Sequence, residues 1–276
     1  MDRQTSTRTG SRGIHPPEMN VVHTLNVVHL RVVPNDRRER TRQAKRARIL
    51  AAAGGVIDRD GLDGLTMQAV AFELDCAVGT LYTAFESKAE MVAALQAEAV
   101  AVLEASLHSA RATWEDELAQ LEAELAALVE LVAYGAFVSS AAVVYPDETR
   151  LVRALLGDAA PPRGSDEARA LLPVVLRLLD PPVSRLADGV GLGVLHPGDP
   201  VARALGWLSA VHGVLRLEAL GPLDRHLFRA GPLARSLTED LLCGWGAPRD
   251  DVEVATSHLD RLTALGPLAP PPEPPQ

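Results

Sequence analysis

Cysteine, aromatic residues and long apolar runs are all scarce in this sequence. Its 276 residues include two cysteines, Cys76 and Cys243, which are too few for a disulfide framework and so predict a reducing, cytoplasmic location. No apolar run reaches 18 residues, and the longest candidate, residues 131–144, is interrupted by a glycine and two serines. We interpret it as a buried core helix and expect no membrane segment. The N-terminus has no apolar run with a cleavage site, so no secretory signal is expected.

The sequence also lacks the patterns that carry catalysis. It contains no nucleophile–base pair, no metal-ligand spacing and no phosphate-binding glycine loop. His212 and Glu218 are six residues apart and do not share a helix face, which argues against a metal site there. We therefore expect no enzyme, no cofactor and no bound metal. An enzyme is the alternative, and turnover of a bound small molecule would support it.

Charge is distributed unevenly along the chain. Apolar residues make up 47% and aromatic residues 4%, a composition dominated by Ala and Leu that favours helices packed on helices. The net charge is −9, yet residues 1–50 carry 11 Arg and Lys against 4 Asp and Glu. Residues 91–276 carry 14 Arg against 25 Asp and Glu. A basic head on an acidic body is typical of a protein that touches phosphates at one end only.

Residues 66–88 predict two short helices joined by a tight turn. Thr66 is a good N-cap for the first helix. The apolar face of that helix is formed by Met67, Val70, Ala71 and Leu74. Asp75 and Cys76 lie where the chain must turn. The second helix, about 77–84, buries Leu81 and Phe85 and presents on its other face Val78, Thr80, Tyr82 and Thr83. This arrangement is typical of the recognition helix of a helix-turn-helix.

The residues Gly79-Thr80-Leu81-Tyr82, then Phe85, then Ser87-Lys88 resemble the signature of the tetracycline-repressor (TetR) family, Gly-Val-Ser-x-Gly-x-Leu-Tyr-x-x-Phe-x-x-Lys. The likeness covers about residues 40–95 well and the rest only in layout. Two positions depart from it, because Asp75 replaces the turn glycine and Ala77 replaces the capping serine. Asp tolerates the left-handed conformation better than most residues. The lost cap costs about 1 kcal/mol, and a carboxylate near phosphates would weaken DNA binding.

The resemblance implies an all-α protein with a three-helix helix-turn-helix head, a long linking helix and a helical-bundle body. The resemblance implies a DNA-binding domain (36–90) and an effector-binding and dimerisation domain (91–248). The residues themselves predict a disordered N-terminal extension (1–35), which has no sustained helical pattern, and an extra helix with a proline-rich tail (249–276). The implied partners are double-stranded DNA, a small-molecule effector and a second copy of the chain. An unliganded homodimer would bind a palindromic operator as a repressor, its recognition helices about 34–36 Å apart, and a small apolar effector would release it.

Tyr82 and Lys88 are the strongest candidate DNA contacts, because the resemblance places both on the phosphate backbone. Tyr82 could instead pack on the supporting helix, and Lys88 could be an ordinary charge at a helix start. Thr80 and Val78 would face base edges. The basic run 37–48 is either a solvated helix end or a set of phosphate contacts. The full set of candidates is Arg42, Lys45, Arg46, Arg48, Thr66, Gln68, Ala77, Val78, Gly79, Thr80, Tyr82, Thr83 and Lys88.

Helix signals continue through the chain. The helix after Arg37 contains Gly54 and Gly55, which we interpret as a close approach to a crossing helix, and it ends at Gly61 as a left-handed cap. Lys88 opens a helix of roughly 20 residues. Asp199 and Pro200 form a strong helix start. The expected body helices are 114–144, 146–156, 166–180 (ended by Pro181 and Pro182), 184–192, 201–219, 233–245 and 250–265.

Two further sets of residues are predicted for the body. The residues nominated for an effector pocket are Tyr134, Phe137, Tyr145, Trp207, His212 and Arg216, although for each of them a place in the plain core or on the surface is the favoured alternative. A leucine stripe could be internal core or a dimer seam, and the resemblance favours a seam of Leu205, Leu208, Leu215, Leu233, Leu237, Leu241 and Trp245. Trp207 with His212-Gly213 resembles a Trp/His-Gly body subtype of the family. The alternative function is a regulator-derived ligand- or partner-binding protein with a degenerate head, as Asp75 and Ala77 would allow.

Overall fold

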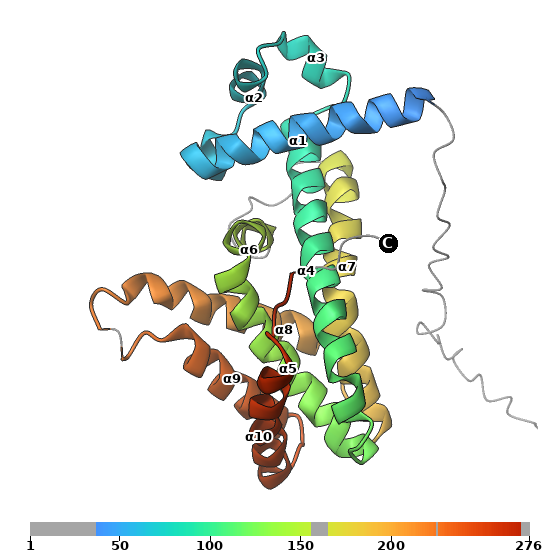
Figure 1. Cartoon of the computed structure of the whole chain (residues 1–276), viewed down its shortest axis with the longest axis vertical. Helices are drawn as coiled ribbons and strands as arrows, with labels where there is room; N and C mark the ends of the chain where they lie inside the picture. The colour runs from blue at the N-terminus through green and yellow to red at the C-terminus, as the bar shows by residue number, and fades with distance from the viewer. Residues whose placement is uncertain (1–36, 156–164, 225, 272–276) are drawn as a thin grey trace, which may run out of the picture. The chain divides into compact units, whose positions relative to one another are not determined.

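The computed structural model describes residues 37–155, 165–224 and 226–271, and all regular structure in these ranges is helical. The all-α prediction is therefore confirmed (Figure 1). The extension expected to be disordered, residues 1–35, lies outside the described residues. The helices are α1 (Arg37–Gly64), α2 (Met67–Glu73), α3 (Val78–Tyr82), α4 (Lys88–Leu118), α5 (Ala123–Val144), α6 (Pro146–Arg153), α7 (Ser165–Gly191), α8 (Pro200–Leu217), the 3₁₀ turn η3 (Glu218–Leu220), α9 (Ala230–Gly244) and α10 (Arg249–Leu265).

The head has its own apolar core, formed where α1, α2 and α3 meet the start of α4. Its buried members are Ile49, Leu50, Ala53, Val56, Ile57, Leu65, Met67, Val70, Ala71, Leu81, Phe85, Met91 and Leu95. Gly54 and Gly55 do not serve a close helix crossing, since a Cβ at either would meet nothing within 4 Å. That interpretation was wrong. Gly61 does take a positive φ of 74°, but it kinks α1 and helical residues continue to Gly64.

Two helix boundaries in the body differ from the prediction. The single helix expected over 114–144 is two helices, because α4 ends at Leu118 and α5 begins at Ala123. No proline or glycine marks the turn between them. The break expected at Pro181-Pro182 is absent, and α7 continues through Pro173 and both of these prolines. A proline removes a helix hydrogen bond and clashes with the preceding turn. Here the buried side chains of α7 on either side, Val174, Leu179 and Leu186, pack into the body and keep the helix continuous.

Helix α5 is the central element of the body and packs against α6, α7, α8, α9 and α10. Figure 1 shows α4 beside α7 and α8 beside α9, in agreement with their contacts. Both α4 and α5 are long and apolar enough to cross a membrane, but half of the α5 window is buried inside the body. Close approach of α9 to α5 depends on Gly135, where a Cβ would lie 2.7 Å from the Oγ1 of Thr238. That Oγ1 also accepts a hydrogen bond from Trp207 Nε1 at 3.0 Å.

The C-terminal segment is built into the body. Helix α10 packs against α5 and α4, with Val252, Ala255, Leu259 and Leu262 buried. Beyond it, the carbonyl of Pro270 accepts hydrogen bonds from Ser106 Oγ (2.6 Å) and from Tyr145 Oη (2.5 Å). Ser106 therefore anchors the tail to α4, and Tyr145 anchors it to the end of α5.

Candidate DNA-binding helix and body cavity

The first helix of the turn motif starts as its sequence predicts. Thr66 is the N-cap of α2, and its Oγ1 accepts the backbone N–H of Ala69 at 3.0 Å. This bond satisfies one of the amides that a helix start leaves without an intrahelical partner. Gln68 lies exposed in the first turn of the same helix, and Thr66 is exposed beside it.

The turn between α2 and α3 is built on Asp75, whose φ of 50° is the one positive value among the described residues other than glycine. The N–H of Cys76 donates to Ala71 O at 3.0 Å, and the N–H of Asp75 donates to Phe72 O at 3.1 Å. These 6→1 and 5→2 bonds form a Schellman motif, which usually has glycine at this position. Asp75 performs the geometric role of glycine but adds a negative charge beside the recognition helix.

Helix α3 is only five residues long and is held by two fully buried side chains, Leu81 and Phe85. Its N-cap, Ala77, provides no side-chain hydrogen bond. Tyr82 is 52% exposed, so it does not pack away on the supporting helix. The other predicted residues of this segment are also accessible: Ala77, Gly79, Thr83 and Lys88 are exposed, and Val78 and Thr80 are half-buried. The outer face of α3 is therefore open.

Two of the predicted basic contacts tie α1 to the end of α3. Lys45 Nζ donates to Thr83 Oγ1 at 2.7 Å. Arg46 donates to the carbonyl of Ala84, pairs with Glu90 at 3.2 Å and stacks 4.0 Å from the centre of the Phe85 ring. This guanidinium is engaged on three sides and positions the recognition helix. The other two basic candidates, Arg42 and Arg48, are exposed on α1.

Helix α4 begins with a capping arrangement that sequence inspection missed. Ser87 Oγ accepts the N–H of Glu90 at 3.1 Å, and Glu90 Oε2 accepts the N–H of Glu86 at 2.6 Å. The Ser-x-x-Glu spacing is a capping-box signal that could have revealed it. The cap places Lys88 at the first helical position, next to the end of α3.

We expect Asp75→Gly to stabilise the protein and Asp75→Asn to leave its stability nearly unchanged. Glycine adopts positive φ without the Cβ penalty, a gain of roughly 0.5–1 kcal/mol, whereas Asn keeps the aspartate's tolerance of this conformation. Both variants remove the charge and should bind DNA more tightly by up to about 1 kcal/mol, or roughly fivefold. Urea unfolding and DNA titration of the two variants separate backbone strain from charge. Equal stability of all three chains would contradict the strain argument.

The body contains a cavity enclosed by five helices, which we call the body cavity. Its apolar lining is Val100, Leu103 and Leu107 of α4, Phe137, Val138 and Ala141 of α5, Val152 of α6, Leu178 and Pro181 of α7, and Leu208 of α8. The polar side chains at its wall are Tyr134, Thr149, His212 and a Glu104–Arg177 pair. Three predicted pocket residues thus meet there: Tyr134, Phe137 and His212. The other three do not line it, since Tyr145 anchors the tail, Trp207 is core and Arg216 is exposed on α8.

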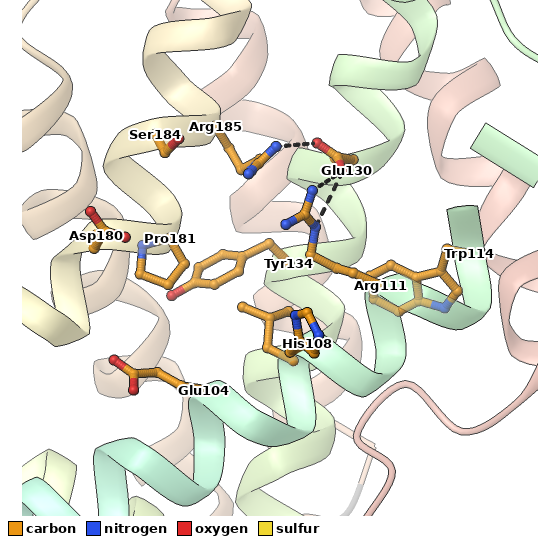
Figure 2. A pocket seen from close by; sticks show the side chains of 11 residues that line it. Glu104, His108, Arg111, Trp114, Glu130, Tyr134, Asp180, Pro181, Ser184 and Arg185 are labelled. Carbon is orange, nitrogen blue, oxygen red and sulfur yellow. Dashed lines mark hydrogen bonds and ion pairs between the residues drawn. The ribbon is translucent and has the colours of Figure 1, made fainter. Parts of the chain in front are cut away.

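A second, more polar cavity adjoins the first and shares Tyr134 with it (Figure 2). Glu130 Oε1 lies 2.8 Å from Arg111 Nη2, and Glu130 Oε2 lies 2.9 Å from Arg185 Nη1. These contacts join α4, α5 and α7 through one carboxylate. No sequence pattern indicated them, because the three residues are far apart in the chain. Among the described residues, no cluster of histidine, cysteine or carboxylate side chains could hold a metal ion.

The residues predicted for the dimer seam fall into two groups. Leu208 and Leu215 are buried in the chain's own core. Leu205 and Leu233 are 39% and 37% exposed on the adjacent helices α8 and α9. The remaining members, Leu237, Leu241 and Trp245, are half-buried along the same stripe. An apolar strip therefore remains on the surface of α8 and α9.

An open five-residue helix on a Schellman turn, supported by a capped α2 and bonded to a basic α1, has the geometry of a helix-turn-helix. Residues 49–95 match the family described as bacterial regulatory proteins, tetR family. The head therefore contains a segment similar to the N-terminal helix-turn-helix domain of this family.

Solved structures share the fold at low sequence identity. RolR in complex with resorcinol is 15% identical, with 79% of this chain and 96% of RolR covered and a TM-score of 0.51. A protein of unknown function from Rhodococcus sp. RHA1 is 22% identical, with 73% and 95% covered and a TM-score of 0.50. A tetR-family regulatory protein from Rhodococcus RHA1 is 19% identical, with 74% and 98% covered and a TM-score of 0.49. No curated protein matches the chain.

Proposed function

We propose that the chain is a homodimeric, effector-responsive repressor that binds a palindromic operator and is released by a small, largely apolar molecule. The observation that carries this proposal is the open face of α3, with Tyr82 and Lys88 exposed, inside the segment that matches the tetR family. The domains follow as proposed from the sequence: head (36–90), effector and dimer domain (91–248) and C-terminal addition (249–276). The likeness of Trp207 with His212-Gly213 to the Trp/His-Gly subtype supports the same assignment of the body.

In the proposed DNA complex, α3 enters the major groove. Val78 and Thr80 would face base edges, Val78 through apolar contact with a thymine methyl group. Tyr82 and Lys88 would contact phosphates, together with Arg42 and Arg48 of α1. Lys45 and Arg46 would act mainly by positioning α3, since both already bind its C-terminal end. Phosphate contacts fix the register on the duplex, whereas base contacts supply the sequence preference.

The proposed dimer forms through α8 and α9. Their apolar strip, with Leu205 and Leu233 exposed, would be covered by the same strip of a second copy. Such an isologous pairing gives two-fold symmetry, which a palindromic site mirrors. Leu208 and Leu215 contribute to this interface indirectly, because they form the core beneath it.

The body cavity is the proposed effector site, and α6 connects it to the head. Thr149 and Val152 of this short helix line the cavity. Between them, Arg150 Nη2 lies 2.8 Å from Asp58 Oδ1 of α1, and Leu151 packs against the head core. A ligand that displaces α6 would therefore shift α1 and the recognition helix. The size of the response equals the difference in ligand affinity between the two arrangements.

Titration with operator DNA tests the proposal. We expect the wild-type chain to bind DNA from upstream of its own gene in gel shifts, with affinity that falls steeply as salt rises. Lys88→Ala should weaken binding on all sequences and lower the salt slope by about one per head. Tyr82→Ala should weaken it roughly tenfold, or about 1.4 kcal/mol.

Arg249→Ala is the matched control, since it removes an exposed arginine from α10, outside the head. The DNA affinity of Arg249→Ala should equal that of the wild type. No binding at low salt, or binding that Tyr82→Ala and Lys88→Ala leave unchanged, would refute the proposal. Such a result would favour the alternative, a ligand-binding protein with a degenerate head, which the uncapped α3 at Ala77 already suggests.

A further inference from the structure

The segment that follows α10, residues 266–271, is attached to the body at the corner where α5 passes into α6. We propose that this segment, which we call the strap, is a releasable restraint on α6. The restraint itself depends only on contacts within the body. Its consequence for DNA binding rests on the proposed function, in which α6 carries the effector signal to the head.

The polar attachment of the strap is a single carbonyl group, that of Pro270. Its oxygen accepts hydrogen bonds from Ser106 Oγ at 2.6 Å and from Tyr145 Oη at 2.5 Å. Ser106 lies on α4 and is fully buried, whereas Tyr145 lies between α5 and α6. A buried hydroxyl that loses its partner is strongly disfavoured, so both bonds favour the attached strap.

Apolar packing also favours the attached strap, but it does not extend far. Ala269 is buried in the core of the body, and Leu268 packs against that core. Three of the six strap residues are prolines, which restrict the free segment and so reduce the entropy lost on attachment. The strap contains no helix, and a segment with few buried contacts opens locally at low cost. It can therefore detach while the helices of the body remain folded.

Tyr145 connects the strap to α6, because its side chain binds one and its backbone begins the other. The residue is the N-cap of α6, and its carbonyl oxygen accepts the N–H of Thr149 at 3.0 Å and the Thr149 hydroxyl at 2.7 Å. Its own N–H donates to Ala141 O of α5 at 2.8 Å. A strap that holds the Tyr145 side chain therefore holds the first turn of α6.

The second half of α6 is attached separately, to α4. Gln96 is 1% exposed, and its Nε2 donates to Leu151 O at 3.3 Å. Between the two attachments, Arg150 Nη2 lies 2.8 Å from Asp58 Oδ1 of the head. Release of the strap would free the first turn of α6 and leave the Gln96 bond in place. We therefore expect α6 to pivot about its C-terminal half rather than to unfold.

Hydrogen–deuterium exchange of the full-length protein tests the strap without DNA or effector. Tyr145→Phe removes only the hydroxyl that binds Pro270 O, and Ser106→Ala removes the other donor. Each variant should speed amide exchange in the strap and in residues 149–153 about fivefold, and the double variant at least about tenfold. Exchange in α8 should stay within about twofold of the wild type. A general loss of stability would instead speed exchange in both helices.

Ser109→Ala is the matched control, because Ser109 also lies on α4 but its hydroxyl bonds Ala105 O of the same helix at 3.1 Å. Its exchange should match that of the wild type in the strap and in α6. Unchanged exchange of residues 149–153 in the double variant, or equal acceleration in α6 and α8, would overturn the inference. Tyr145→Phe alone decides the question if the double variant fails to fold.

Titration with operator DNA separates the strap from the proposed function. A pivoting α6 leaves the position of α1 less defined, and DNA binding then has to order it. The double variant should therefore bind operator about threefold more weakly than the wild type. Faster exchange in α6 with unchanged operator affinity would support the strap and count against the coupling of α6 to the head, which belongs to the proposed function.

Discussion

A Leu233→Glu chain is expected to be monomeric and to bind operator DNA at least about 100-fold more weakly than the wild type. Leu233 is exposed on α9, which packs against α8, the other helix of the proposed interface. Pairing two copies would bury two carboxylates without counter-charges, which costs several kcal/mol. A monomer also loses the second half-site, and linked sites gain about 10²–10⁴ in affinity over single ones.

The fold of the monomer should survive this substitution. Leu233 lies in the first turns of α9, where a negative charge interacts favourably with the helix dipole. Leu172→Glu is the matched control, since Leu172 is 57% exposed on α7 and lies outside α8 and α9. Sedimentation and operator titration should find Leu172→Glu dimeric and fully active. The interface is misplaced if Leu233→Glu stays dimeric, or if the control also dissociates.

The helix-turn-helix was predictable because its determinants are local. Thr66 caps a helix through an amide three residues away, and Asp75 takes the left-handed conformation that Asp tolerates. The spacing of Leu81 and Phe85 identifies the buried face of α3. Each of these signals acts between residues within one or two helical turns of each other, so the local sequence contains what is needed to predict the helix-turn-helix.

Features that depend on distant residues were not predictable. The stacking of Arg46 on Phe85 requires α1 to pack against the end of α3. The sequence does not show this contact, and Arg46 was therefore predicted to bind phosphate like the other basic residues of α1. The continuity of α7 through Pro181-Pro182 depends on packing against α4, α5 and α8. The rule that proline breaks a helix describes an isolated helix, and it therefore does not include stabilisation by packing against neighbouring helices.

The leucine stripe of α9 shows how periodicity alone can misplace a buried face. Leu233, Leu237 and Leu241 have the same four-residue spacing as the buried residues of α9 but each precedes one of them by a single position, which places the leucines at the edge of the core. The buried face of α9 is instead Ala230, Ala234, Thr238 and Leu242. These residues are mostly small, which lets α9 approach Gly135 of α5 closely. The leucines are thereby left at the surface, where a second copy of the chain can cover them.

The coupling between cavity and head gives the last expected result: Arg150→Met should bind an effector of the body cavity as the wild type does but fail to release DNA in response. Arg150 Nη2 lies 2.8 Å from both Asp58 of α1 and Asp147 of α6. The pair is largely exposed, so its loss should change stability by less than about 1 kcal/mol. Typical coupling energies are about 1–3 kcal/mol, or 5- to 150-fold in affinity. A variant that loses most of this coupling energy should keep its operator affinity within about threefold when the effector is added.

Calorimetry measures effector binding, and DNA titration with and without the effector measures the response. Asp147→Asn is the matched control, because it removes the Arg150 contact within α6 and leaves the contact with Asp58 of α1. Asp58→Asn should reproduce the Arg150→Met result, since it removes the head side of the same pair. If Arg150→Met releases DNA as fully as the wild type, the signal reaches the head through the packing of Leu151 on the head core instead. Leu151→Ala should then weaken the response, because Leu151 of α6 packs against the head core.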